Sequence, residues 1–275
     1  CANCYAGTNT ELKWVDRRAH VVQNIKSRMP DVIGIQEASQ GWLSGTSISQ
    51  FEDLRTRLRA AGTAYEVTDL DRNNCVKSTT PSSCKYKDQG ASQGTKVFYN
   101  TSTVEKLSCG SKMLPQCSGC NDRYVAWGIF KYKATGKKFF FANTHLEPGS
   151  DKYSIRQSQA VTMMAEIARQ NVDSLPVFVV GDLNSTRYFS PANAPYDKIV
   201  AAGLVDPLGH SYKSAAISLK ATAEKRVHAN YNSFNDFSRT LTKYADNQNG
   251  SNIDYIFTSP MRTLEWETVL TLDDA

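Results

Sequence analysis

The spacing of apolar and polar positions predicts three helices along the chain. Apolar residues recur at helical spacing over residues 14–29, and Pro30 follows, where a helix has to end. The same spacing returns over residues 51–61, which Gly62 terminates, and over residues 154–170. In each stretch the apolar positions gather on or near one face, so each helix is expected to pack that face against a core.

Seven short runs of apolar or alternating residues predict strands. Several of them are apolar at consecutive positions, which is typical of strands buried on both faces. Two of them alternate between apolar and polar residues. The runs cover residues 31–39, 96–100, 124–133, 137–147, 177–185, 251–259 and 264–272.

The remaining segments are polar and rich in turn-forming residues. Residues 68–95 and 108–122 are predicted to be long loops that carry cysteines, and residues 186–250 are expected to hold short helices. Strands and helices mingle without the strict alternation of a wholly parallel sheet. We therefore predict a layered α/β sandwich with sheets inside and helices outside. No shift in composition divides it, so residues 1–275 are interpreted as a single domain.

The overall composition narrows the class of protein only slightly. The chain has 275 residues, 40% of them hydrophobic and 21% charged, which is typical of a globular protein. No apolar run approaches the roughly 18 residues of a membrane helix, so no membrane span is predicted. Lysine and arginine exceed the acids by 32 to 27. This mild excess favours an anionic partner such as a phosphate ester or a nucleic acid.

Cysteines concentrate in one stretch of the chain that is otherwise rich in serine, threonine, glycine and asparagine. Cysteine-rich loops are typical of an oxidising compartment, so the protein is predicted to be secreted. Cys75 and Cys84 are expected to bond to each other, and Cys109 to bond to Cys117 or Cys120. Such bonds would close short loops that have few apolar anchors.

Two pairs of cysteines leave a zinc site as the alternative. Cys1 with Cys4, and Cys117 with Cys120, each have the C-x-x-C spacing of zinc ligands. Disulfides are favoured because the zinc site would need two distant segments to meet. The count of seven is odd, so at least one thiol is unpaired or bonded to sequence outside this chain. Cys1 itself is expected to be a buried strand residue.

Four of the predicted strands lead into acidic, amide or histidine side chains. Each has an ordinary explanation by itself, as a cap, a buried histidine or a turn residue. Together they fit one chemistry, because Mg²⁺ takes one or two carboxylates together with waters and phosphate oxygens. Histidine can move a proton at a phosphate ester, and amide donors stabilise charge on phosphoryl oxygens. These residues are Glu37, His145, Asp182 with Asn184, and Asp254.

The order of these motifs resembles the endonuclease/exonuclease/phosphatase superfamily. Asn3 comes first, Glu37 follows in a Q-E pair, and N-T-H-L, G-D-L-N and I-D-Y-I stand at 143–146, 181–184 and 253–256. The likeness covers nearly the whole chain. It implies a four-layer α-β-β-α sandwich with two central mixed β-sheets, which agrees with the layered fold predicted above.

The resemblance also implies which residues hold a metal ion. Glu37 would be the main ligand of Mg²⁺, with Mn²⁺ or Ca²⁺ as alternatives, and Asn3 would lie near the same ion. Asp254 would join the metal or the histidine network.

The same resemblance assigns roles around the phosphate. His145 would contact it and support its charge or protonation, Asp182 would orient or activate the attacking water, and Asn184 would bind a phosphoryl oxygen. Arg123 stands where relatives often carry a basic phosphate contact, although a solvated arginine at a strand start explains it equally well. Tyr99 is interpreted as core packing. Arg156 is interpreted as helix surface, and three further histidines as surface or structural residues: His20, His210 and His228.

One family motif is missing. Members of the family end with S-D-H on a loop before the final strand, whereas this chain stops at T-L-D-D-A. The natural protein is expected to continue past Ala275, because a sandwich without its last strand would leave a long unpaired edge. The alternative is a member that has lost part of its machinery.

The sequence predicts a secreted, Mg²⁺-dependent phosphoesterase that cleaves phosphodiesters, with DNA as the first substrate to consider. A lipid or small-molecule phosphodiesterase or phosphatase is the alternative within the same fold. A non-catalytic binding module is the alternative from another class, and the retention of Glu37, His145, Asp182, Asn184 and Asp254 argues against it. No protein partner is inferred, and a monomer is expected.

Overall fold

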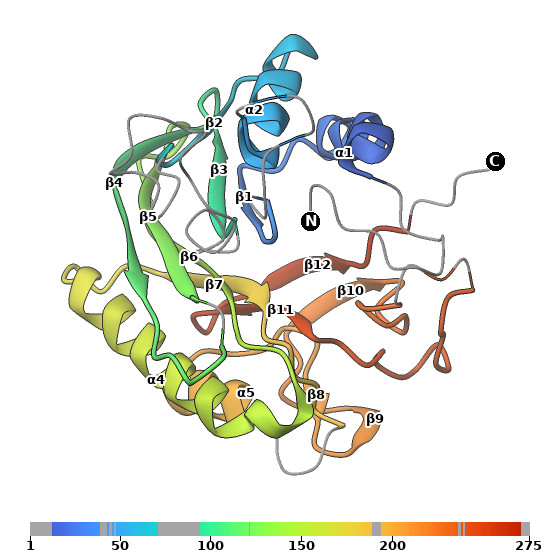
Figure 1. The fold of residues 1–275 in the computed structure, drawn as a ribbon. Helices are drawn as coiled ribbons and strands as arrows, with labels where there is room; N and C mark the ends of the chain where they lie inside the picture. Colours follow the sequence, from blue (N-terminus) through green and yellow to red (C-terminus); the bar gives the residue numbers. More distant parts are fainter. Residues whose placement is uncertain are drawn as a thin grey trace.

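Four layers of secondary structure stack on one another in the computed structural model (Figure 1). Two helices cover a three-stranded sheet, that sheet faces a five-stranded sheet, and two further helices cover the outer side of the larger sheet. The predicted α-β-β-α sandwich is therefore confirmed. The structure describes residues 13–38, 43, 46, 48–70, 94–120, 122–188, 194–235, 238 and 240–270.

The first helical layer consists of α1 (Trp14–Arg28) and α2 (Gln50–Ala60). Helix α1 ends where predicted, because Met29 adopts a left-handed backbone with φ of 46° directly before the proline. Helix α2 begins with a capping box, in which the Glu52 carboxylate accepts the Ser49 backbone N–H at 2.8 Å. Both helices thus begin or end through local chemistry that the sequence encodes.

The smaller sheet has the order β1-β3-β2, formed by β1 (Val32–Ile35), β3 (Lys96–Asn100) and β2 (Tyr65–Val67). Both of its strand pairs are antiparallel. Its outer face packs on α1 and α2 through one apolar cluster. The fully buried aromatic and leucine side chains of that cluster are Trp14, Phe51, Leu58, Tyr65 and Phe98.

The larger sheet has the order β11-β7-β6-β5-β4 and is mixed. Only β6 and β7 run parallel, and the other neighbours are antiparallel. The strands are β4 (Val104–Met113), β5 (Tyr124–Tyr132), β6 (Lys138–His145), β7 (Val177–Asp182) and β11 (Asp254–Thr258).

Strand β6 explains why the larger sheet is buried on both faces. Phe140 and Ala142 belong to the core beneath α4 (Tyr153–Gln170) and α5 (Ala194–Ala201). Phe141, between them, belongs to the core that faces the smaller sheet. Successive side chains of a strand point to opposite faces, so a continuous apolar run is what a sheet between two layers requires.

The two sheets approach closely at Gly34 of β1. A Cβ atom there would lie 2.4 Å from Cγ2 of Val180 and 2.8 Å from Cγ of Asn143, closer than carbon atoms can pack. Glycine is therefore required for β1 to lie against β6 and β7 at this point. The close contact brings the ends of β1, β6 and β7 together.

Several predictions for the loops are wrong. Residues 108–113 belong to β4, and the turn-rich segment contains α5 but also β8 (His210–Ser211), β9 (Ser214–Ile217) and β10 (Ala223–Val227). The last predicted strand exists as β12 (Thr263–Glu267), and it pairs in parallel with β10 in a separate two-stranded sheet. A short 3₁₀ helix, Ser150–Lys152, precedes α4. No helix in the described ranges is long and apolar enough to cross a bilayer.

The predicted partner of Cys109 is also wrong. Cys117 and Cys120 are bonded to each other, and Cys109 is a free thiol. The reason is that Cys109 lies within β4, opposite Gly128 of β5, where its thiol donates to the Thr68 carbonyl at 3.3 Å. Four cysteines fall outside the described residues, so the predicted bond between two of them stays a prediction: Cys1, Cys4, Cys75 and Cys84.

Candidate active site

Strand register aligns three of the predicted site residues. His145 is the partner of Asp182 across β6 and β7, and Asp254 is the partner of Asp182 across β7 and β11. The Nε2 atom of His145 lies 3.6 Å from Oδ2 of Asp182. These three side chains therefore meet at one edge of the larger sheet, as their positions at strand ends predict.

Glu37 reaches the same place from the smaller sheet. It follows β1 with φ of 58°, a left-handed conformation that turns the chain sharply. The neighbouring Gln36 donates to Oδ1 of Asn143 at 2.6 Å, and Asn143 in turn donates to the Ile35 carbonyl at 2.8 Å. Asn143 thus ties the end of β1 to β6, two residues before His145.

Burial, followed by the repulsion between carboxylates, sets the electrostatics of the cluster. Burial and then the charge of Asp254 raise the pKa of Asp182 to about 7, with a further contribution from Glu37. Burial also raises the pKa of Asp254 to about 6, and Glu37 adds to this while a hydrogen bond from Ser233 opposes it. Glu37 therefore acts on both aspartates, which places its charge in the same cluster.

The surroundings of His145 favour its neutral form. Its residue surface is only 3% exposed, and burial, followed by the nearby charge of Arg123, holds its pKa well below its usual value. Its Nδ1 atom is buried and has no hydrogen-bond partner in the described part of the chain. A neutral imidazole carries a single N–H, so this ring can donate one hydrogen bond while its other nitrogen accepts.

The turn after β7 fixes Asp182 and Asn184 together. The Asn184 backbone N–H donates to Oδ1 of Asp182 at 2.7 Å, and its side-chain amide donates to the Leu146 carbonyl at 2.9 Å. Asn184 has φ of 48°, and Gly181 has φ of 149°. A Cβ at Gly181 would lie 2.1 Å from the Thr144 carbonyl oxygen, so only glycine permits β7 to approach β6 here.

Arg123 is buried, and the alternative of a solvated arginine is wrong. Its residue surface is 2% exposed, and its Nε donates to Oε2 of Glu147 at 2.8 Å. Its Nη1 is buried without a hydrogen-bond partner in the part that the structure describes. The guanidinium also lowers the pKa of His145, so its charge acts on the site.

Arg156 does not lie on the helix surface, which corrects the prediction made for it. Its Nη1 donates to the carbonyls of Glu147 and Gly149 at 2.9 and 2.7 Å. Gln159, one turn further along α4, accepts the Glu147 backbone N–H at 3.0 Å. The sequence did not reveal these positioning residues, and the only signal was Glu147, which directly follows the N-T-H-L motif.

The remaining predictions concern isolated residues. Tyr99 packs on Phe130 with ring centroids 5.5 Å apart, which confirms its place in the core. His20 and His228 are exposed, whereas His210 is buried and pairs with Asp206, so these histidines are surface or structural as predicted. Asn3 lies outside the described residues.

The donor set fits a hard divalent cation. Carboxylates that raise one another's pKa lack compensating charge, and a cation would supply it. Within the described residues, no three of the His, Cys, Asp and Glu side chains form a ready-made ligand cluster. Mg²⁺ does not need one, because it is usually held by one or two carboxylates and keeps several waters.

Residues 1–274 match the sequence model of the endonuclease/exonuclease/phosphatase family, so the chain belongs to this family. Among curated proteins it is similar to nocturnin of Drosophila melanogaster, with 23% identity over 266 residues. That match covers 91% of this chain but 36% of the relative, so the chain spans about a third of the length of nocturnin.

Two solved bacterial structures show the same fold. The endonuclease/exonuclease/phosphatase from Bacteroides vulgatus is 25% identical with a TM-score of 0.64, over 94% of this chain and 85% of that one. The mannosyl-6-phosphatase of Bacteroides thetaiotaomicron VPI-5482 is 19% identical with a TM-score of 0.64, over 94% and 82%. The fold class predicted from the motifs is thus shared by independently solved relatives.

Proposed function

We propose that the chain is a divalent-metal-dependent hydrolase of phosphodiester bonds, with DNA as its substrate. The observation that carries the proposal is the meeting of Glu37, Asp182, Asp254 and His145 at one edge of the larger sheet. Half-buried acids with raised pKa beside a neutral histidine are typical of sites that move protons. A purely structural cluster gains nothing from uncompensated charge.

Each residue has a role that follows from its surroundings. Asp182 has a pKa of about 7 in the metal-free protein, so it can accept a proton from an attacking water near neutral pH. The neutral His145 can donate its N–H to a phosphoryl oxygen, and Asn184 retains a second amide N–H for the same purpose. A bound Mg²⁺, held by Glu37 and its neighbours, would neutralise charge on the phosphate.

Phosphodiesters of DNA are the preferred substrate because the formal net charge of the chain is +5. A phosphatase acting on small phosphorylated molecules is the second candidate. It is supported by the mannosyl-6-phosphatase, which shares the fold over 94% of this chain. A common fold does not fix the substrate, so the two candidates have to be separated by activity.

The test is a hydrolysis panel with each of Mg²⁺, Mn²⁺ and Ca²⁺. Plasmid DNA, RNA and bis(nitrophenyl) phosphate report diesterase activity, and nitrophenyl phosphate and mannose 6-phosphate report monoesterase activity. We expect plasmid cleavage with Mg²⁺ that excess EDTA abolishes. Asp182→Asn should lose this activity, and Asp173→Asn, at an exposed loop residue, is the matched control.

Two results would contradict the proposal. Full activity in excess EDTA would exclude the metal, and equal activity of Asp182→Asn and Asp173→Asn would exclude the site. Binding of these substrates without turnover under any metal would instead support a binding module.

We also propose that the protein works in an oxidising compartment. The bonded pair of Cys117 and Cys120 supports this, because such bonds rarely persist in the cytosol. Mass spectrometry of alkylated protein from its natural source should find these two cysteines unmodified before reduction. Complete alkylation before reduction would reject the proposal.

A further inference from the structure

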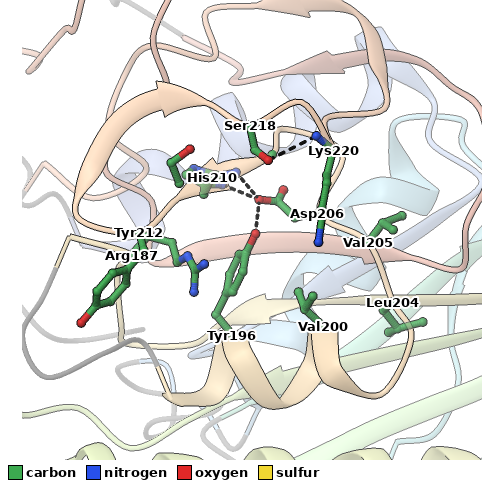
Figure 2. Close-up of a pocket in the computed structure, with 12 residues that line it drawn as sticks. Arg187, Tyr196, Val200, Leu204, Val205, Asp206, His210, Tyr212, Ser218 and Lys220 are labelled. Carbon is green, nitrogen blue, oxygen red and sulfur yellow. Dashed lines mark hydrogen bonds and ion pairs between the residues drawn. The ribbon is translucent and has the colours of Figure 1, made fainter.

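A pocket of about 310 Å³ lies on the side of β11 that faces α5 (Figure 2). It is separate from the candidate active site, because none of the five predicted catalytic and metal-binding residues described above lines it. His210 of its wall packs against Tyr255 of β11, with ring centroids 5.3 Å apart. Its polar lining residues include Arg187, Asp206, His210, Tyr212, Ser218 and Lys220.

The carboxylate of Asp206 is already satisfied. It accepts the Tyr196 hydroxyl at 2.9 Å and the Nδ1–H of His210 at 2.7 Å (Figure 2). It also accepts the backbone N–H groups of Leu208 and His210 at 3.0 and 2.8 Å. These bonds fix the ring of His210. Asp206 therefore needs no cation from solution, and its negative charge is spread over four donors.

His210 has one nitrogen that lacks a partner. Its Nδ1 is engaged by Asp206, and its Nε2 is buried without a hydrogen bond to any described residue. A buried polar atom without a partner costs free energy, which a water or a ligand group can recover. Phosphate suits this position because a phosphate group offers both an O–H donor and oxygen acceptors.

Two cations, Arg187 and Lys220, line the pocket beside the acid Asp206. Arg187 pairs with Asp197, and its guanidinium lies 4.2 Å from the ring centroid of Tyr196. Lys220 forms no ion pair within the described ranges, and in Figure 2 its side chain runs along the same side of the pocket as Val205. The charge of Lys220 therefore favours an anion over a metal ion.

We propose that this pocket binds a small phosphomonoester. The phosphoryl group is bound by Lys220, whose ammonium group lies beside the apolar wall, whereas Arg187 lines the other side of Tyr196. The organic part packs against Tyr196 and the apolar wall formed by Val200, Leu204 and Val205. A cavity of this volume holds one small molecule with a single ring and excludes a polymer.

The binding test uses the full chain carrying Asp182→Asn in excess EDTA, so that neither a metal nor turnover contributes. Calorimetric titrations use inorganic phosphate and phenylphosphonate, a stable analogue of an aryl phosphomonoester. We expect one saturable site, with phenylphosphonate bound more tightly because its ring meets the apolar wall. Phenol alone should not bind.

Two variants test whether the ligand binds in this pocket. Lys220→Gln should weaken binding about tenfold, the usual effect of one lost charge-assisted hydrogen bond. Lys220 is exposed, so this change should leave the fold intact. Lys138→Gln, at an exposed lysine that begins β6, is the matched control and should bind like the parent.

Three results would overturn the inference: no saturable binding at millimolar phosphate or phenylphosphonate, equal affinity of the Lys220→Gln and Lys138→Gln proteins, or loss of binding on adding Asn184→Ala. The last result would place the anion in the candidate active site. Because binding is measured without turnover, failure here leaves the proposed hydrolase function untouched, and failure of that function leaves this pocket untouched.

Discussion

Two histidine–aspartate pairs of this molecule have opposite electrostatics. In the pocket, Nδ1 of His210 lies 2.7 Å from Asp206, and in the candidate active site Nε2 of His145 lies 3.6 Å from Asp182. Burial alone would raise the pKa of Asp206, but hydrogen bonds from His210 and Tyr196 lower it below its usual value. The pKa of Asp182 is raised to about 7 instead.

The difference comes from the neighbours of each carboxylate rather than from its burial. Asp206 accepts four hydrogen bonds, whereas Asp182 accepts one backbone N–H and faces the charges of Asp254 and Glu37. A buried acid that is fully hydrogen-bonded supports the fold. A buried acid that faces other acids costs stability, and such sites are typical of function.

The largest expected effect separates the two pairs by activity. Asp182→Asn removes the proton acceptor and should lower the rate of phosphodiester hydrolysis by about 10²–10⁴-fold. Asp206→Asn should leave the rate per folded molecule near that of the parent, because Asp206 lies in the other pair. Initial rates normalised to the folded fraction test both, and equal losses in the two variants would contradict the comparison.

The free energy of unfolding should fall in Asp206→Asn and not in Asp182→Asn, the reverse of the order expected for activity. Asp206→Asn leaves the donors of His210 and Tyr196 poorly paired in a buried site, so the free energy of unfolding should fall by about 2–4 kcal/mol. Asp182→Asn should leave the metal-free protein equally stable or more stable, since it removes repulsion. Urea denaturation in EDTA measures both, and a large loss of stability in Asp182→Asn would show that its carboxylate supports the fold.

A divalent cation should stabilise one pair and not the other. At ten times its dissociation constant, Mg²⁺ should raise the free energy of unfolding by about 1.4 kcal/mol. Glu37→Gln should abolish most of this gain. Asp206→Asn should show the full gain, although its free energy of unfolding is lower to begin with. Thermal midpoints with and without Mg²⁺ give the comparison, and the same gain in Glu37→Gln would place the ion elsewhere.

The smallest effect is the pH dependence of the metal-free protein. Asp182 and Asp254 have raised pKa values of about 7 and about 6, so the folded state binds more protons than the unfolded state between about pH 4 and 7. Stability from these groups is therefore greatest below that window and declines as the pH rises through it. Asp206, with its lowered pKa, contributes stability that is lost only as the pH falls below its unfolded value.

Urea denaturation between pH 5 and 7.5 should therefore show a decline in the metal-free parent. Its size should be on the order of 1 kcal/mol, below the full linkage value, because solvent screens these partly exposed carboxylates. The double variant Asp182→Asn with Asp254→Asn should show a flatter profile. An identical slope in the double variant would assign the effect to other groups.

The sequence predicted those features that depend on a continuous pattern. The helices α1, α2 and α4 follow apolar spacing, and the run that forms β6 is apolar at consecutive positions because both of its faces are covered. Strand β10 escaped detection because its residues are mostly polar and because β12, its partner among the described strands, lies far along the chain. Strand β4 escaped for a related reason, since it is largely exposed at the edge of its sheet.

For the candidate site, the sequence identified residues but not their surroundings. Asp182 and Asp254 stood out because each adjoins a predicted strand, whereas their alignment depends on strand register that no local pattern encodes. Arg156 was assigned to the surface because its helical position alone does not reveal the Glu147 and Gly149 carbonyls that it binds. Buried polar side chains satisfied by distant backbone groups are invisible to periodicity.

The same pairing of β6, β7 and β11 determines both the packing of the core and the geometry of the candidate site. A slip of β7 by one residue would exchange the side chains of its two faces, so Val179 would leave the core beneath α4 at the same moment that Asp182 left His145. A misaligned molecule would therefore be both inactive and unstable, and unfolding or proteolysis would remove it from the population. Preparations of this protein should accordingly contain fully competent or unfolded molecules, with no lasting pool of folded but incompetent ones.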